Sequence, residues 1–225
     1  FNHKTKTNMK SNTPKLEPDT FYHVYNRGIN GETIFKQERN YAYFLGKYAH
    51  YIEPVAKTYA YCLLKNHFHL LIQTRSESEI LDNFKSPVSA IGDNPIVNSS
   101  AKNKTASFHI SNQFAKLFNG YCQAINKACN RTGGLFEEPF LRIHVESEDY
   151  FTRLVWYIHH NPQKHHFVSD FRNYSHSSYH SFLIDKPTKL QRTYVLQWFG
   201  NAAAYQKFHQ LQIDEKEIEQ LIIEL

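Results

Sequence analysis

The order of the predicted elements indicates an α+β protein: a ferredoxin-like split β-α-β sandwich with a C-terminal helical appendage. Alternating apolar residues predict strands, and apolar residues three and four apart predict helices, in the order strand, helix, strand, strand, helix, strand, helix. Lys65 and Asn66 form a tight turn that joins the two middle strands as a hairpin. The 225 residues suit one such domain with additions.

Each element rests on a local pattern. The predicted strands are residues 21–25, 55–64, 67–73 and 135–145, and the predicted helices are residues 38–52, 76–84, 111–129 and 147–161. Pro54 follows the first long helix, and a serine begins the short one. The last helix should end at His160 or Asn161, because Pro162 restricts the residue before it.

Three further segments flank or interrupt this domain, which we place at residues 18–180. Residues 1–17 are rich in Lys, Asn and Thr and are expected to form a flexible tail. Residues 85–106 lack apolar periodicity and are expected to form a mobile loop. Residues 181–225 are interpreted as a helical extension, with helical patterns at 193–211 and 214–225.

Composition narrows the class of protein. The formal charge is +5, from 26 basic and 21 acidic residues, and the chain has 15 Tyr and 17 Phe, which is compatible with a polyanionic partner. Its three cysteines lack metal-type spacing, which favours a reducing, cytoplasmic location. No apolar run is long enough to span a bilayer, and we see no secretory signal, so no membrane partner is expected.

A histidine pair lies in the predicted 67–73 strand. Because side chains alternate along a strand, His67 and His69 share one face, and Phe68 between them points into the core. Two adjacent imidazoles can supply two ligands to a divalent metal. The alternative is a polar stripe on a half-exposed strand without a metal.

The helix at 147–161 carries a second candidate group. Tyr150, Arg153, Tyr157 and Asn161 form a polar and aromatic stripe at helical spacing. Together with the histidines, the Asn161 amide oxygen suggests a site for Mg²⁺ or Mn²⁺, with the Tyr157 phenol one turn away. The plainer alternatives are a packing tyrosine and an asparagine that ends a helix.

Four sequence blocks occur in a recognisable order. They are FYHVYNRG at 21–28, AYCLLKNHFHLLI at 60–72, WYIHHNP at 156–162 and YSHSSY at 174–179. Together they resemble the single-tyrosine transposases of the insertion-sequence 200 type, which have the HUH endonuclease fold. The nearest branch is the REP-associated tyrosine transposases.

The resemblance implies a metal-dependent enzyme that cleaves and joins single-stranded DNA near hairpins through a 5′-phosphotyrosine intermediate. It assigns Tyr157 as the nucleophile and His67, His69 and Asn161 as ligands of Mg²⁺ or Mn²⁺, with His160 as a rival for the third ligand. It also implies a bacterial cytoplasmic protein acting on nucleoid DNA, either as a monomer or as a homodimer that exchanges the tyrosine helix. Candidate DNA contacts are the basic residues Arg27, Lys65, Arg142 and Arg153.

The chain departs from the family pattern at two places. Glu138 and Pro139 precede Phe140, where family members often have a small residue and an arginine; Arg142 is a substitute phosphate contact. Residues 163–166 read QKHH in place of the family's usual VRAG. A nucleic-acid-binding module that no longer cleaves is therefore a second hypothesis. A hydrolase acting on a small substrate is a third, and it leaves Tyr157 without a role.

Overall fold

The computed structural model describes residues 13–85, 104–213 and 216, apart from the side chains of residues 148 and 149. Four strands form one antiparallel sheet in the order β2-β3-β1-β4. The strands are β1 (Phe21–Arg27), β2 (Ala56–Leu63), β3 (His67–Thr74) and β4 (Leu141–His144). This order, with β3 inserted between β1 and β2 and with β1 between β3 and β4, confirms the predicted ferredoxin-like α+β fold.

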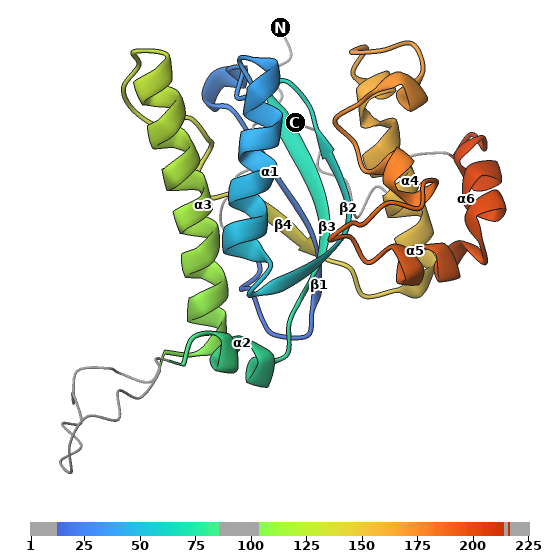
Figure 1. Cartoon of the computed structure of the whole chain (residues 1–225), viewed down its shortest axis with the longest axis horizontal. Coiled ribbons are helices and arrows are strands. Elements are labelled where there is room, and N and C mark those ends of the chain that lie inside the picture. The colour runs from blue at the N-terminus through green and yellow to red at the C-terminus, as the bar shows by residue number, and fades with distance from the viewer. Residues whose placement is uncertain (1–12, 86–103, 214–215, 217–225) are drawn as a thin grey trace, which may run out of the picture.

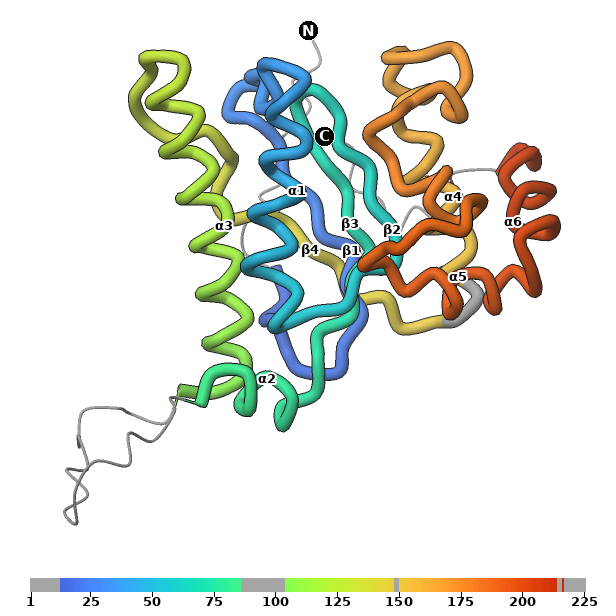
Figure 2. Tube along the Cα trace, in the orientation of Figure 1, coloured from blue at the N-terminus to red at the C-terminus, as the bar shows by residue number. Residues whose placement is uncertain are grey.

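Helices cover both faces of this sheet (Figure 1). They are α1 (Glu38–Ile52), α2 (Glu77–Asn83), α3 (Ala106–Ala128), α4 (Glu148–Lys164), α5 (Arg192–Phe199) and α6 (Ala202–His209). The tube view in Figure 2 shows α1 and α3 side by side on one face and α4 and α5 on the other. The 3-10 turns η3 (Phe171–Asn173) and η4 (Tyr179–Phe182) connect α4 to α5.

The alternation along β3 divides the apolar residues between two cores. Phe68, Leu70 and Ile72 are buried against the layer of α1 and α3. Leu71 points the other way and is buried with Leu154 of α4. His67 and His69 have the same parity as Leu71, so β3 presents both histidines to the α4 side, as the sequence predicts.

The start of α3 differs from the prediction. Thr105 caps the helix by accepting a hydrogen bond from the Phe108 backbone N–H, so α3 begins at Ala106, five residues earlier than expected. Buried Ile110 continues the apolar stripe into this first part. Residues 86–103 of the expected loop lie outside the described residues.

The end of α4 also differs, because Pro162 lies inside the helix and the helix continues to Lys164. The prediction that Pro162 ends the helix is therefore wrong. A proline removes one backbone donor but leaves the later ones, and the His165 N–H still bonds to the Asn161 carbonyl at 2.9 Å. This extra turn extends the helix face that carries Tyr157.

The fourth strand is shorter than predicted. Phe136 forms only an isolated bridge with Gly28, and regular pairing is confined to Leu141–His144. Pro139 lies between these two stretches and has no N–H for a strand ladder.

The C-terminal extension forms two short helices where one helix over 193–211 was expected. Gly200 adopts φ +94° after α5, and the Asn201 side chain then caps α6 by accepting from the Ala204 N–H. The predicted helix at 214–225 falls outside the described residues, apart from Lys216, as do residues 1–12 of the expected tail. Leu16 is buried in the core, so the end of that tail packs on the domain. No described helix is both long enough and apolar enough to cross a membrane.

Candidate active site

The two strand histidines form a buried pair. His67 is 4% and His69 1% exposed, and their ring centroids lie 5.3 Å apart with nearly perpendicular planes. Phe68 anchors the strand in the opposite core. The strand therefore directs both imidazoles to the face of the sheet that packs against α4.

Each of these imidazoles has a partner at Nδ1. The Nδ1 of His67 lies 2.8 Å from the Asn66 side-chain oxygen, and the Nδ1 of His69 lies 3.0 Å from Nε2 of His23. Both Nε2 atoms are buried and have no hydrogen-bond partner among the described residues. A buried acceptor without a partner costs about 1–3 kcal/mol, so these atoms are poised for a ligand.

Both rings are held neutral by their surroundings. Burial, followed by the nearby charges of His165 and Arg27, lowers the pKa of His67 to about 3. Burial and the neighbouring histidines, His23 first, hold the pKa of His69 well below its usual value. Neutral imidazole is the form that coordinates metals.

Helix α4 brings its polar stripe against this pair. Tyr157 is 3% exposed and meets His69 edge-on, with ring centroids 5.6 Å apart. His165, eight residues later, meets His67 in the same way at 4.8 Å. Asn161 lies midway between them on the same helix face, since residues four apart stack on one side. Helical spacing therefore places it on the face of α4 that carries Tyr157.

Asn161 carries a buried side-chain oxygen on this face of α4. The side chain is fully buried, and its Nδ2 donates to the Tyr157 carbonyl at 2.8 Å. Its Oδ1 has no hydrogen-bond partner in the described part of the chain. The structure thus brings His67, His69 and Tyr157 together, and Asn161 lies one turn after Tyr157 on α4 with a buried oxygen that has no described partner.

The donor set fits the predicted metal. Six buried side-chain polar atoms lack a partner among the described residues, and four of them belong to this site: His67 Nε2, His69 Nε2, Asn161 Oδ1 and the Tyr25 hydroxyl. No cluster of three His, Cys, Asp or Glu side chains suited to a metal occurs in the described ranges. A third protein ligand here would therefore be the amide oxygen. Two imidazole nitrogens and one amide oxygen suit Mn²⁺ and are acceptable to Mg²⁺.

The other helix histidines lie elsewhere. His160 stacks between Trp156 and Phe171, with ring centroids at 4.0 and 3.9 Å, and its Nδ1 bonds to the carbonyl of Trp156. His160 therefore does not face the strand histidines. The side chain of His159 points toward the C-terminal segments: its Nε2 lies 2.8 Å from the Ser178 hydroxyl, and its Nδ1 lies 2.9 Å from Nε2 of His209.

The structure adds three residues that the sequence did not single out. His23 and Tyr25 alternate on β1 and share the histidine face; the Tyr25 ring stacks on His69 at 5.9 Å. Burial raises the pKa of Tyr25, and the nearby Tyr157 raises it further. On α4, the Lys164 Nζ lies 5.4 Å from the centroid of the Tyr157 ring. His23 and Tyr25 could have been found from the alternation along β1. Lys164 could have been found because it lies seven residues, or two helical turns, after Tyr157.

The four predicted DNA contacts are not all at this site. Arg27 opposes His67 in the β1–β3 register and pairs with Glu137 at 2.9 Å. Arg142 opposes Val24, which belongs to the core on the α1 side, so Arg142 lies on the other face of the sheet. Lys65 is exposed in the hairpin turn, and Arg153 is half-buried one turn before Tyr157.

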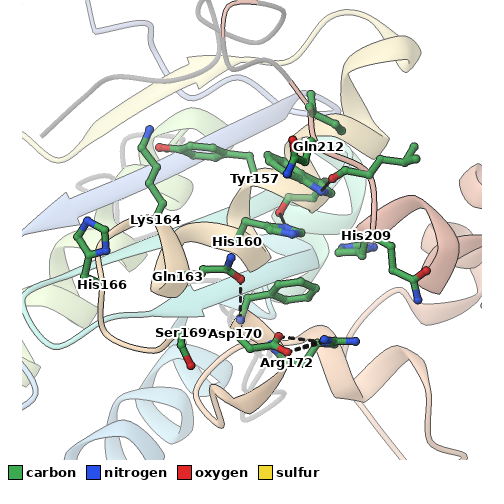
Figure 3. A pocket seen from close by; sticks show the side chains of 15 residues that line it. Tyr157, His160, Gln163, Lys164, His166, Ser169, Asp170, Arg172, His209 and Gln212 are labelled. Carbon is green, nitrogen blue, oxygen red and sulfur yellow. Dashed lines mark hydrogen bonds and ion pairs between the residues drawn. The ribbon is translucent and has the colours of Figure 1, made fainter.

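A cavity of about 800 Å³ opens beside the nucleophile candidate. Figure 3 shows the Tyr157 hydroxyl end turned toward the Lys164 amine, and His160 is also among the lining residues. The far side is formed by Asp170, which holds Arg172 in an ion pair at 2.6 Å, and by residues 209–213. The cavity gives Tyr157 a route to solvent.

Comparison with known proteins gives one structural likeness. No family model matches the chain, and no curated protein matches it. The fold is similar to that of a solved REP-associated tyrosine transposase bound to a REP hairpin. The similarity covers 76% of this chain and 83% of that one, at 14% sequence identity and a TM-score of 0.47.

Proposed function

We propose that this protein is a metal-dependent single-stranded DNA endonuclease and strand transferase that cuts hairpin-associated DNA through a 5′-phosphotyrosine on Tyr157. One observation carries the proposal. Two buried imidazole nitrogens on β3, without partners among the described residues, lie beside Tyr157, which lines an open cavity. The Asn161 oxygen, also buried and without a described partner, is one helical turn from that tyrosine.

His67, His69 and Asn161 would hold Mg²⁺ or Mn²⁺ in this site. When bound, the ion would polarise the scissile phosphate and offset charge on the leaving oxygen. A set of neutral ligands leaves the ion's full charge available to the phosphate, whereas carboxylate ligands would partly neutralise it.

Tyr157 would supply the nucleophile. Its phenol oxygen forms a bond to phosphorus as the bond to the 3′ oxygen breaks; the phenol proton is lost and the 3′ oxygen gains one. The Lys164 ammonium, close to the Tyr157 ring, would favour the phenolate and attract the phosphate. Attack by a free 3′-OH reverses the step and joins strands without a nucleotide cofactor.

The cavity beside Tyr157 would receive the unpaired nucleotide next to the cut. Its aromatic walls at Trp156 and Phe171 suit a base, and Lys164 and His166 suit the phosphate that follows. Its volume of about 800 Å³ lies within the range of small-ligand sites, roughly 300–1,000 Å³.

The test is formation of a covalent adduct. Hairpin DNA with a single-stranded flank, labelled at either the 3′ or the 5′ end, is incubated with protein and Mn²⁺ and run on a denaturing gel. The 3′ label should migrate with the protein and the 5′ label should not. Tyr157→Phe should abolish the adduct, and EDTA should prevent it.

Tyr121→Phe is the matched control, because Tyr121 is a buried phenol in the core on the other face of the sheet. It should retain the adduct. An adduct formed by Tyr157→Phe, or one that persists in EDTA, would refute the assignment.

A nucleic-acid-binding module that does not cleave is the second candidate. The Arg27–Glu137 ion pair favours it, because Glu137 offsets a positive charge beside His67 that would otherwise help to stabilise the transition state at the scissile phosphate. Hairpin binding without any adduct, in Mn²⁺ and Mg²⁺ and on many hairpins, would support this candidate over cleavage.

A further inference from the structure

We propose that His23 is a positioning residue for the metal site. It accepts a hydrogen bond from Nδ1–H of His69 and so keeps His69 in the tautomer whose Nε2 is free to bind a cation. This inference rests on the proposed function, because it assumes that His69 is a metal ligand.

The geometry joins the two rings closely. His23 Nε2 lies 3.0 Å from His69 Nδ1, and the rings stack with centroids 5.2 Å apart and planes 26° apart. His23 opposes Leu71 in the β1–β3 register, which makes it a diagonal neighbour of His69 on the same face. Both side chains are essentially fully buried, so water does not compete for this contact.

A neutral imidazole carries one N–H, so the direction of this hydrogen bond decides what His69 can do. If His69 donates from Nδ1, its Nε2 bears a lone pair. If His23 donates from Nε2, the proton of His69 is on its own Nε2, and that nitrogen cannot bind a metal. The unpartnered Nε2 of His69 is useful as a ligand only in the first case.

The second histidine shows the same arrangement with an unambiguous partner. The Asn66 side-chain oxygen, 2.8 Å from Nδ1 of His67, can only accept, so His67 must donate from Nδ1 and leave its Nε2 bare. His23 thus has the position toward His69 that Asn66 has toward His67. Such partners behind metal-binding histidines typically change metal affinity by about 10–100-fold.

The experiment measures Mn²⁺ affinity of the full chain without DNA, from the electron paramagnetic resonance signal of free Mn²⁺. His23→Phe should weaken Mn²⁺ binding by about 10–100-fold. His23→Gln, whose side-chain oxygen can accept from His69, should recover most of the affinity. His209→Phe alters another buried histidine, in the cavity wall and not among the proposed metal ligands, and should bind Mn²⁺ like the parent in the absence of DNA.

Two results keep this inference separate from the proposed function. Loss of Mn²⁺ binding in His67→Ala with unchanged binding in His23→Phe would refute the role of His23 alone. Unchanged binding in His67→Ala would refute the metal site itself. In the parent protein, ¹⁵N spectra of the imidazoles should show a pyrrole-type Nδ1 and a pyridine-type Nε2 for His69. The reverse pattern would overturn the inference even if the variants do not fold.

Discussion

Replacing Asn161 with leucine is expected to stabilise the metal-free protein while removing most of its stabilisation by Mn²⁺. Asn161 is fully buried, and its side-chain oxygen has no partner in the part of the chain that the structure describes. Leucine has nearly the same size and removes that oxygen. The substitution therefore removes both the stability cost of the unpartnered oxygen, seen without metal, and the stabilisation that the oxygen would give by binding Mn²⁺.

The expected magnitude follows from these contacts. Relief of the unpartnered oxygen gains about 1–3 kcal/mol, and loss of the 2.8 Å bond to the Tyr157 carbonyl costs about 1 kcal/mol. The net gain is on the order of 1 kcal/mol, which raises Tm by about 2–4 °C for a chain of this size. In the parent, Mn²⁺ at about 100 times its Kd adds roughly 2.7 kcal/mol, or about 5–11 °C.

Thermal unfolding in EDTA measures the stability of the metal-free variant, and unfolding in Mn²⁺ measures how much the metal raises its Tm. The variant should melt above the parent in EDTA and below it in saturating Mn²⁺. Asn26→Leu is the matched control: Asn26 is 4% exposed, but its oxygen accepts the Arg27 N–H at 2.8 Å. That variant should lose stability and keep the Mn²⁺ shift. An Asn161→Leu protein that melts below the parent in EDTA, or keeps the full shift, would refute the reasoning.

Three other predictions follow from the surroundings of the site. Lys164→Gln should slow adduct formation about 10-fold, equivalent to about 1.4 kcal/mol, and Lys164→Arg should not; equal rates in all three would exclude a role for the charge. Glu137→Gln should free Arg27, tighten hairpin binding and raise the salt slope by about 1 in fluorescence anisotropy; an unchanged slope would show that Arg27 does not contact DNA. Burial lowers the pKa of His209 to about 3, below its unfolded value of about 6.5, so the stability it contributes is present above pH 6.5 and lost as pH falls toward 3. Between pH 6.5 and 4.5 this loss is roughly 2.3 kcal/mol, and urea unfolding of His209→Phe should show a correspondingly shallower decline.

Much of the fold is predictable because its signals are local. Period-two alternation predicts β3 and its two faces, and the turn at Lys65 and Asn66 predicts the hairpin. The bounds of α1 agree with the prediction as well. The helix continues past Pro162 because a proline removes only one backbone donor, and the later His165 N–H still bonds to the Asn161 carbonyl.

The surroundings of the site are less predictable because they depend on strand register. Nothing near His23 shows that it will lie diagonal to His69, 46 residues away, since the pairing of β1 with β3 sets that contact. The same holds for Arg142, whose face depends on how β4 pairs with β1. The roles of Tyr157 and Asn161 stay predictions, although the structure places Tyr157 beside His69 and Asn161 one turn further along α4.

The buried contacts of His159 with Ser178 and His209 bear on whether α4 could be exchanged between two subunits. His159 ties the back of the helix to Ser178 and His209, which come from two later segments of the same chain. A helix exchanged with a second subunit would have to break these buried contacts or take both segments with it. In the structure Tyr157 lies beside His69 of the same chain. On the proposed function, we therefore expect the rate of DNA cutting per chain not to depend on protein concentration.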